Sequence, residues 1–71
     1  MNKINPKKLL NSKWTAVKPV NKEKHFIIVA VEYDGNASVL ECVIEAVISK
    51  RQRSFEWRDL NDKAVWLSGW T

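Results

Sequence analysis

Apolar residues gather in one stretch, His25–Ser49, and their spacing predicts two neighbouring strands. His25–Asp34 is rich in β-branched and aromatic residues, which favours a strand. Asp34-Gly35 follows and is typical of a hairpin, because glycine readily takes the positive φ of a tight turn. In Val39–Ser49 the side chains then alternate between a wholly apolar face and a face that carries Glu41 and Glu45 among valines. We therefore expect an antiparallel hairpin here.

The pairing of these two strands follows from the faces they present. With a loop of two or four residues, odd-numbered residues of one strand lie opposite even-numbered residues of the other, and both sets share one face of the hairpin. A three-residue loop turns Glu41 and Glu45 toward the core, so we reject it. The expected core face is then wholly apolar, and consists of Ile27, Val29, Val31, Leu40, Cys42 and Ile44.

A helix is the alternative for residues 39–49. The apolar residues of this segment also fit one helical stripe, with Glu41 and Glu45 on the opposite side. Its high β-branched content and the preceding Asp-Gly turn favour the strand.

Shorter elements flank the hairpin. Asn5-Pro6 is typical of a helix start, with asparagine as the cap and proline in the first turn. Lys13–Val17 alternates as a first strand, and Pro19 ends it or places it at a sheet edge. Residues 50–53 predict a bend, and Ser54–Arg58 predicts a fourth strand, unless it continues residues 39–49 as one long bent strand.

The C-terminal segment, residues 59–71, predicts irregular chain with one helical turn. Asp62 can cap a turn over Lys63–Leu67, and Gly69 suits the left-handed residue that ends it. Trp66 and Trp70 would then fold back onto the open end of the sheet.

Together these elements predict one small, mostly β domain over residues 1–71, with residues 1–5 frayed. We expect an antiparallel meander of three or four strands, with short helical turns near both termini. The sheet either stays open or curls into a half-open barrel similar to the small SH3-like barrels. Four tryptophans in so short a chain supply core area or an exposed binding platform.

Charge is distributed unevenly along the chain, whose net charge is +4. Residues 1–25 carry seven lysines against Glu23, whereas residues 26–49 carry four carboxylates and no lysine or arginine. Residues 50–71 carry five cations against three carboxylates. Either the basic ends cover an acidic hairpin face, or they form a surface that meets an anionic partner.

Candidate catalytic groups are few. Cys42 is the single cysteine and lies on the expected apolar face, where a thiolate is disfavoured. His25 is the single histidine, and no metal-ligand cluster, cofactor motif or glycine-rich phosphate loop is present. We expect no enzyme, no metal and no cofactor. The lone cysteine, the lack of a signal peptide and the lack of a long apolar run predict a cytoplasmic protein without a membrane span.

Several motifs resemble a known family. KWTAV near the start, EAV followed by SKR in the middle, and EWRDL leading to WLSGW are similar to a family of small tryptophan-rich bacterial proteins of unknown function. The similarity runs from about Lys8 to Trp70 and includes Trp14, Trp57, Trp66 and Trp70. It implies a complete bacterial cytoplasmic protein, and it implies no activity, cofactor or catalytic residue.

The remaining hypotheses are two kinds of binding. Tryptophan and arginine are enriched at protein-binding hot spots, which favours a protein partner or self-association. The alternative is single-stranded RNA or DNA, held by basic residues and stacked on tryptophan rings. For either partner we expect the contacts to be Lys13, Arg51, Arg53, Arg58, Trp66 and Trp70.

Overall fold

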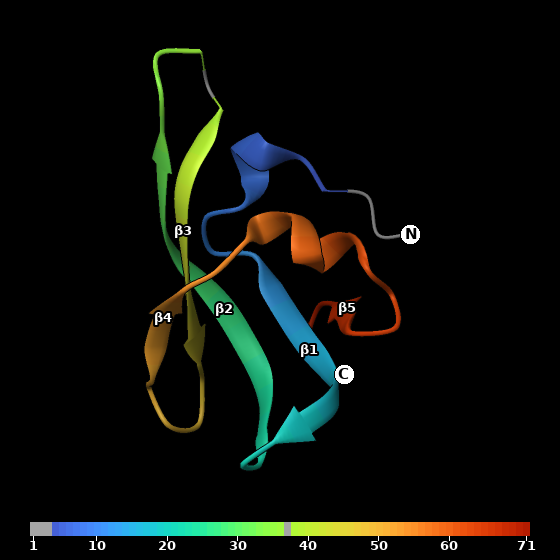
Figure 1. Cartoon of the computed structure of the whole chain (residues 1–71). Helices are drawn as coiled ribbons and strands as arrows, with labels where there is room; N and C mark the ends of the chain where they lie inside the picture. The colour runs from blue at the N-terminus through green and yellow to red at the C-terminus, as the bar shows by residue number, and fades with distance from the viewer. Residues whose placement is uncertain (1–3, 37) are drawn as a thin grey trace.

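A computed structural model describes residues 4–36 and 38–71, and it contains one open antiparallel sheet with two short 3-10 helices (Figure 1). The order of strands across the sheet is β4-β3-β2-β1-β5, so β4 and β5 form its two edges. The predicted mostly β meander is confirmed, with a fifth strand added. In chain order the elements are η1 (Pro6–Lys8), β1 (Lys13–Val20), β2 (Glu23–Tyr33), β3 (Val39–Ala46), β4 (Gln52–Ser54), η2 (Trp57–Asn61) and β5 (Trp66–Ser68).

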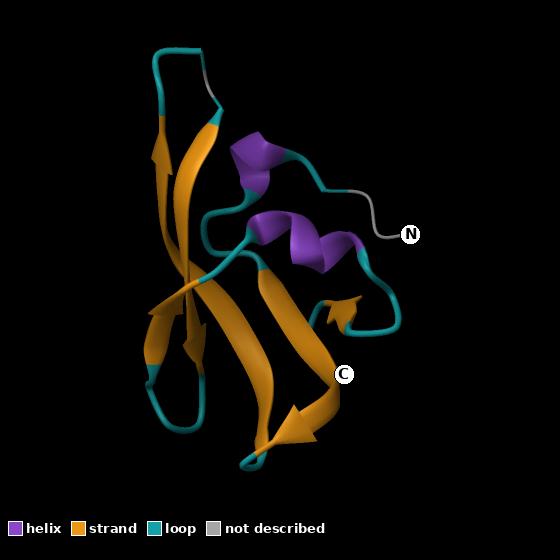
Figure 2. Ribbon diagram, in the orientation of Figure 1, coloured by secondary structure: helices purple, strands orange, loops and turns teal. Residues whose placement is uncertain are grey.

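Both 3-10 helices lie on the same side of the sheet (Figure 2), and this side holds the core. Leu9 after η1 and Leu60 in η2 are buried against residues of the central strands. The connection through η2 leads from β4 at one edge to β5 at the other. The buried apolar core consists of Leu9, Trp14, Phe26, Ile28, Cys42, Ile44, Ala46, Leu60 and Trp66.

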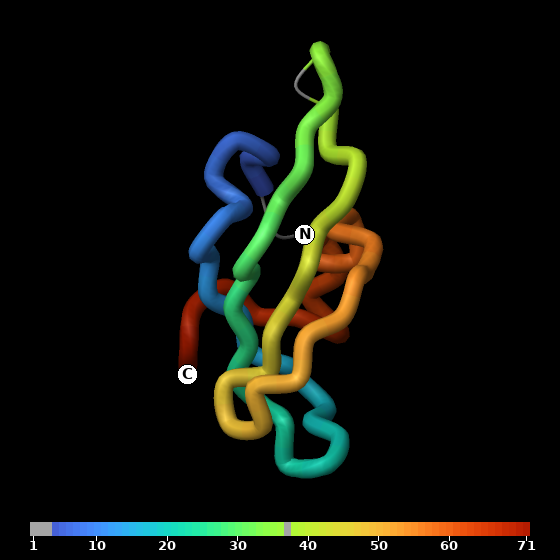
Figure 3. The backbone as a smooth tube through the Cα atoms, turned by 90° about the vertical axis from the view of Figure 1, so that its left-hand side faces the viewer, coloured from blue at the N-terminus to red at the C-terminus, as the bar shows by residue number. Residues whose placement is uncertain are grey.

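The central hairpin is formed by β2 and β3, and its turn end extends beyond the rest of the sheet (Figure 3). The predicted strand from residue 39 is confirmed and the helical alternative is wrong, although β3 ends at Ala46. Residues 47–49 form a turn, so β3 and β4 are separate strands. At the other end, Asp34 begins the connection, and its carboxylate accepts hydrogen bonds from the N–H groups of Asn36 (2.7 Å) and Ser38 (3.0 Å).

The predicted core face of this hairpin is wrong at three of its six positions. Val29 is an extra residue in β2, because Ile28 pairs with Ile44 but Ala30 pairs with Val43. A one-residue bulge turns the side chains on its two sides to opposite faces. Even-numbered residues of β2 therefore reach the core before Val29, and odd-numbered residues do so after it. The buried residues are Phe26 and Ile28, with Val31 packed against them, in place of Ile27 and Val29.

A second bulge lies in β3, at Leu40. Glu32 pairs with Glu41 while Tyr33 pairs with Val39, so Leu40 has no partner of its own. It is 62% exposed, and Val39 packs against the core in its place. The expected burial of Cys42 and of Ile44 is confirmed.

The fourth strand begins earlier than predicted. The expected bend is supplied by the turn at residues 47–49 and by Lys50, whose φ is 62°, while Arg53 belongs to β4. The predicted strand at residues 54–58 is wrong beyond Ser54, because η2 begins at Trp57. The Glu56 carboxylate caps η2 by accepting a hydrogen bond from the Arg58 N–H at 3.3 Å.

The C-terminal segment contains β5, which the sequence pattern did not predict. Asp62 accepts a hydrogen bond from the Ala64 N–H at 2.9 Å, but the turn that it caps ends before Trp66. The left-handed conformation expected for Gly69 is confirmed, with φ +82°. Trp66 is 6% exposed and belongs to the core, whereas Trp70 is 43% exposed.

The N-terminal segment begins with the predicted cap: the Asn5 side chain accepts a hydrogen bond from the Lys7 N–H at 3.0 Å. The expected fraying of residues 1–5 lies outside the described residues for 1–3, whereas Ile4 packs against the core. In β1, Thr15 pairs with His25 and Val20 with Glu23, which leaves residues 16–19 opposite a single residue of β2. This irregularity interrupts the pairing of β1 with β2, and such an interruption bends a strand.

Candidate functional site

A groove lies between the second half of β1 and the β4 edge, beside residues 64–66. Its volume is about 470 Å³. Because β4 and β5 do not pair with each other in the described part of the chain, the curled sheet is open along this line. The groove is lined by Ala16, Lys18, Val20, Asn21, Glu23, Phe26, Arg51, Arg53, Ala64, Val65 and Trp66.

Two aromatic rings form the apolar floor of the groove. The rings of Phe26 and Trp66 are perpendicular, with their centroids 5.1 Å apart and an interplanar angle of 86°. The ring of Phe55 also lies near Trp66, at 6.3 Å between centroids. Since Phe26 is 8% exposed and Trp66 is 6% exposed, only a small part of each ring reaches solvent.

Cations surround this floor. Lys18 belongs to β1 and Arg53 to β4, and Arg51 is the residue that directly precedes β4. Arg51 lies 3.9 Å from the carboxylate of Glu23, which also accepts a hydrogen bond from the Ser49 hydroxyl. Among the described residues, Lys18 and Arg53 have no carboxylate within 4.0 Å. The groove therefore has three cations and one carboxylate that is already engaged.

A second hollow, of about 400 Å³, adjoins the groove and shares Arg53, Val65 and Trp66 with it. Its far side carries Asp59 and Asp62. The groove is thus lined mainly by cations, whereas the adjoining hollow has two carboxylates beside Arg53.

The outer face of the sheet carries a different cluster, formed around Trp70. The indole N–H of Trp70 donates to the Phe26 carbonyl at 2.9 Å, and the ring lies 5.9 Å from that of His25. The ammonium of Lys13 is 4.9 Å from the Trp70 ring centroid. The cation–π contact and the indole hydrogen bond hold the C-terminal segment on the outer face, and Trp70 remains 43% exposed.

Thr15 of β1 binds the same C-terminal segment through its hydroxyl group. It is 1% exposed, and its hydroxyl donates to the Gly69 carbonyl at 2.6 Å and accepts from the Thr71 N–H at 3.1 Å. The backbone carbonyl of Thr71 also lies 2.9 Å from Nε2 of His25. These hydrogen bonds and the contacts of the Trp70 ring together fix residues 69–71 on β1 and β2.

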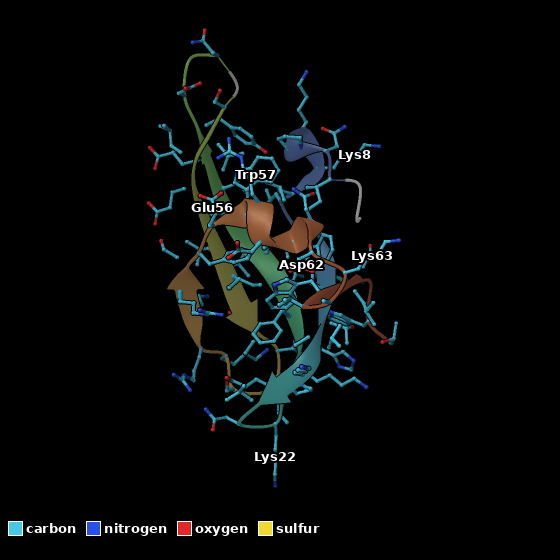
Figure 4. The ribbon with its side chains drawn as sticks, turned by 45° about the vertical axis from the view of Figure 1, so that its right-hand side comes forward. Lys8, Lys22, Glu56, Trp57, Asp62 and Lys63 are labelled. Atoms are coloured by element: carbon cyan, nitrogen blue, oxygen red, sulfur yellow. The ribbon has the colours of Figure 1, made fainter. Side chains whose placement is uncertain are left out.

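The six residues expected from the sequence as contacts thus divide among three places. Arg51, Arg53 and Trp66 meet at the groove, where Trp66 is 6% exposed and forms part of the floor. Lys13 and Trp70 meet on the outer face. Arg58 lies apart, 5.4 Å from the Trp57 ring and 3.9 Å from the Glu56 carboxylate; Figure 4 shows Trp57 and Glu56 beside η2.

Sequence reasoning missed Lys18, Glu23 and Phe26 as groove residues. The sequence did contain a signal for Lys18. It lies four residues after the core residue Trp14 on β1, and residues at even spacing along a strand share a face. The same alternation gave the wrong face for Phe26, because the bulge at Val29 exchanges the two faces of β2. Lys22 lies at the β1–β2 turn, and its side chain points away from the molecule (Figure 4).

Chemically reactive groups are sparse. Burial, with a smaller contribution from the charge of Glu56, raises the pKa of the Cys42 thiol to about 11. Within residues 4–36 and 38–71, no three His, Cys, Asp or Glu side chains are placed to hold a metal ion. Over the same residues, no helix has the length and apolar character needed to cross a membrane.

Comparison with known proteins yields one match. Residues 12–71 match the sequence model of a family described as tryptophan-rich protein (DUF2389). No curated protein and no solved structure was found to match the chain.

Proposed function

The chain belongs to the family of tryptophan-rich proteins described as DUF2389, and on that premise we propose that it is a binding module whose groove holds an acidic segment of a partner protein. The proposal rests on one observation: Lys18, Arg51 and Arg53 surround an apolar floor, and the single carboxylate beside them is already bound to Arg51. A segment with carboxylates and an apolar side chain complements both features.

A protein segment fits this groove better than a nucleic acid does. Single-stranded RNA and DNA bind by stacking bases on exposed aromatic faces. The floor residues Phe26 and Trp66 are both under a tenth exposed, so they offer little ring surface for a base. Trp70 is exposed, but it lies on the outer face under Lys13. An aliphatic side chain needs only a shallow apolar contact.

We further propose that the module has no enzymatic activity and acts in the bacterial cytoplasm. The raised pKa of Cys42 disfavours its thiolate, and its side chain is 2% exposed. His25 is engaged with the C-terminal segment and lies away from the groove. A free buried cysteine is compatible with a reducing compartment.

The proposal can be tested by calorimetric titration with a capped peptide of about six residues, in which glutamates alternate with leucines. We expect binding that weakens as salt concentration rises. Arg53→Glu should weaken it at least about tenfold, or about 1.4 kcal/mol. Arg58→Glu is the matched control, because it makes the same change of charge outside the groove.

Two results would overturn the proposal. One is equal binding of a peptide in which glutamines replace the glutamates. The other is an equal loss of affinity in the Arg53→Glu and Arg58→Glu variants. A third result would assign the groove to nucleic acid instead. In that case the acidic peptide does not bind, a single-stranded RNA oligomer does bind, and the affinity for RNA falls in the Arg53→Glu variant but not in the Arg58→Glu variant.

A further inference from the structure

We propose that the partner segment binds as an additional strand along the free edge of β4, and this inference rests on the function proposed above. Strand addition uses the backbone of an edge strand for affinity and the alternate side chains for specificity. The structure provides both at β4.

The backbone of β4 alternates between a used side and a free side. Arg53 pairs with Ile44 of β3. The Phe55 N–H donates to the Cys42 carbonyl at 3.0 Å, and the Arg51 carbonyl accepts from the Ala46 N–H at 2.9 Å. Odd-numbered residues thus direct their backbone groups toward β3.

Gln52 and Ser54 therefore direct their N–H and C=O groups to the opposite side. No strand among the described residues pairs with β4 there. These groups form a short edge that a strand of another chain can continue.

The side chains of β4 alternate as well. Gln52 donates to the Glu45 carboxylate at 2.7 Å and Ser54 donates to that of Glu41 at 2.6 Å, so both lie on the outer face. Arg51 and Arg53 lie on the groove side. Every second side chain of an added strand would then lie over the groove, beside the two guanidinium groups.

The opposite side of the groove does not offer an equivalent edge. On β1, the Val17 N–H already donates to the Val65 carbonyl at 2.9 Å. The next residue whose backbone faces that way is Pro19, which has no N–H to donate. Proline protects this edge from strand pairing, and β4 remains the edge that borders the groove.

Charge identifies the occupant as an acidic strand. Two copies of this chain joined by their β4 edges would place Arg51 and Arg53 of one copy beside those of the other. Like charges on neighbouring strands are destabilising, and opposite charges are stabilising. A partner strand that carries glutamate or aspartate at alternate positions meets the same two arginines favourably.

Amide hydrogen exchange measured by NMR tests the inference, with the alternating Glu–Leu peptide as probe. In the free protein, the Gln52 and Ser54 amides should exchange fast and the Arg53 and Phe55 amides slowly. Saturating peptide should slow exchange at Gln52 and Ser54 by at least about tenfold. Protection of these two amides without peptide, increasing with protein concentration, would show β4–β4 self-pairing and overturn the inference.

Peptides with a single N-methylated amide separate this inference from the proposed function. Methylation of an N–H that faces β4, at every second position of the peptide, should abolish binding. Methylation at the positions between these should leave binding unchanged. If all methylated peptides bind equally, Arg53→Glu still weakens them, and Gln52 and Ser54 stay unprotected, strand addition is wrong and the acidic groove stands. If the unmethylated peptide does not bind at all, the proposed function fails and the inference fails with it.

Discussion

Replacing Leu60 by alanine should be among the most destabilising substitutions in this chain, whereas the same change at Leu40 should be nearly silent. Leu60 is fully buried and attaches η2 to the core, and Leu40 is a 62% exposed bulge residue. The two substitutions remove identical atoms, so any difference between them arises from their surroundings. The pattern of apolar residues alone predicts the opposite for Leu40.

The expected magnitude follows from burial. Removing a buried leucine side chain costs about 2–5 kcal/mol, because apolar contacts are lost and a cavity is left. An exposed substitution stays within about 0.5 kcal/mol. A domain of this length has a total free energy of unfolding of about 4–11 kcal/mol. Leu60→Ala therefore removes a large share of it.

Urea denaturation followed by tryptophan fluorescence and by circular dichroism measures both values. The change should lie in the midpoint, with the slope m unchanged. A loss below about 1 kcal/mol for Leu60→Ala would refute the docking of η2 onto the sheet. A loss above about 2 kcal/mol for Leu40→Ala would refute the β3 bulge, because Leu40 would then belong to the core.

Three further predictions concern Thr15, the glycines and Cys42. Thr15→Val removes two hydrogen bonds to the C-terminal segment and should cost about 1–3 kcal/mol in urea denaturation; an unchanged midpoint, or no recovery in Thr15→Ser, would contradict this. Gly69→Ala should cost about 1–2 kcal/mol because of its positive φ, and Gly35→Ala, where nothing obstructs a Cβ, is the control that should be near neutral by the same assay. The raised pKa of Cys42 contributes stability that is complete below the ordinary value of 9.0 and is lost as the pH rises toward about 11. The difference in unfolding free energy between the wild type and Cys42→Ala should therefore fall across that window, and a constant difference would show that the folded thiol titrates normally.

Much of the fold follows from local signals. The β2–β3 hairpin has β-branched strands on both sides of Asp34-Gly35, although the positive φ expected at Gly35 is not found. The start of η1 is fixed by Asn5 and Pro6. The bulges at Val29 and Leu40 could not be predicted, because an inserted residue costs little locally and is selected by packing across the whole sheet. A prediction that omits these bulges places every side chain beyond each bulge on the wrong face of the sheet.

The short C-terminal elements were missed for a related reason. β5 has three residues and no strand pattern of its own, and it forms because β1 offers a partner distant in the sequence. The groove depends on that pairing and on the bend of β1. Arg51 and Arg53 were identifiable as a basic pair, but their convergence with Lys18 depends on contacts that sequence spacing does not encode.

The pairing of β1 with β5 has a consequence for how the chain is made. Trp14 pairs with Ser68 in this ladder, so β1 can receive its second neighbour only after residues 66–68 have been synthesised. The β2–β3 hairpin can form earlier, since its contacts are close in sequence. Until residues 66–68 emerge, the outer edge of β1 remains unpaired. The nascent chain therefore exposes an unpaired edge of β1 from the synthesis of that strand until the synthesis of β5.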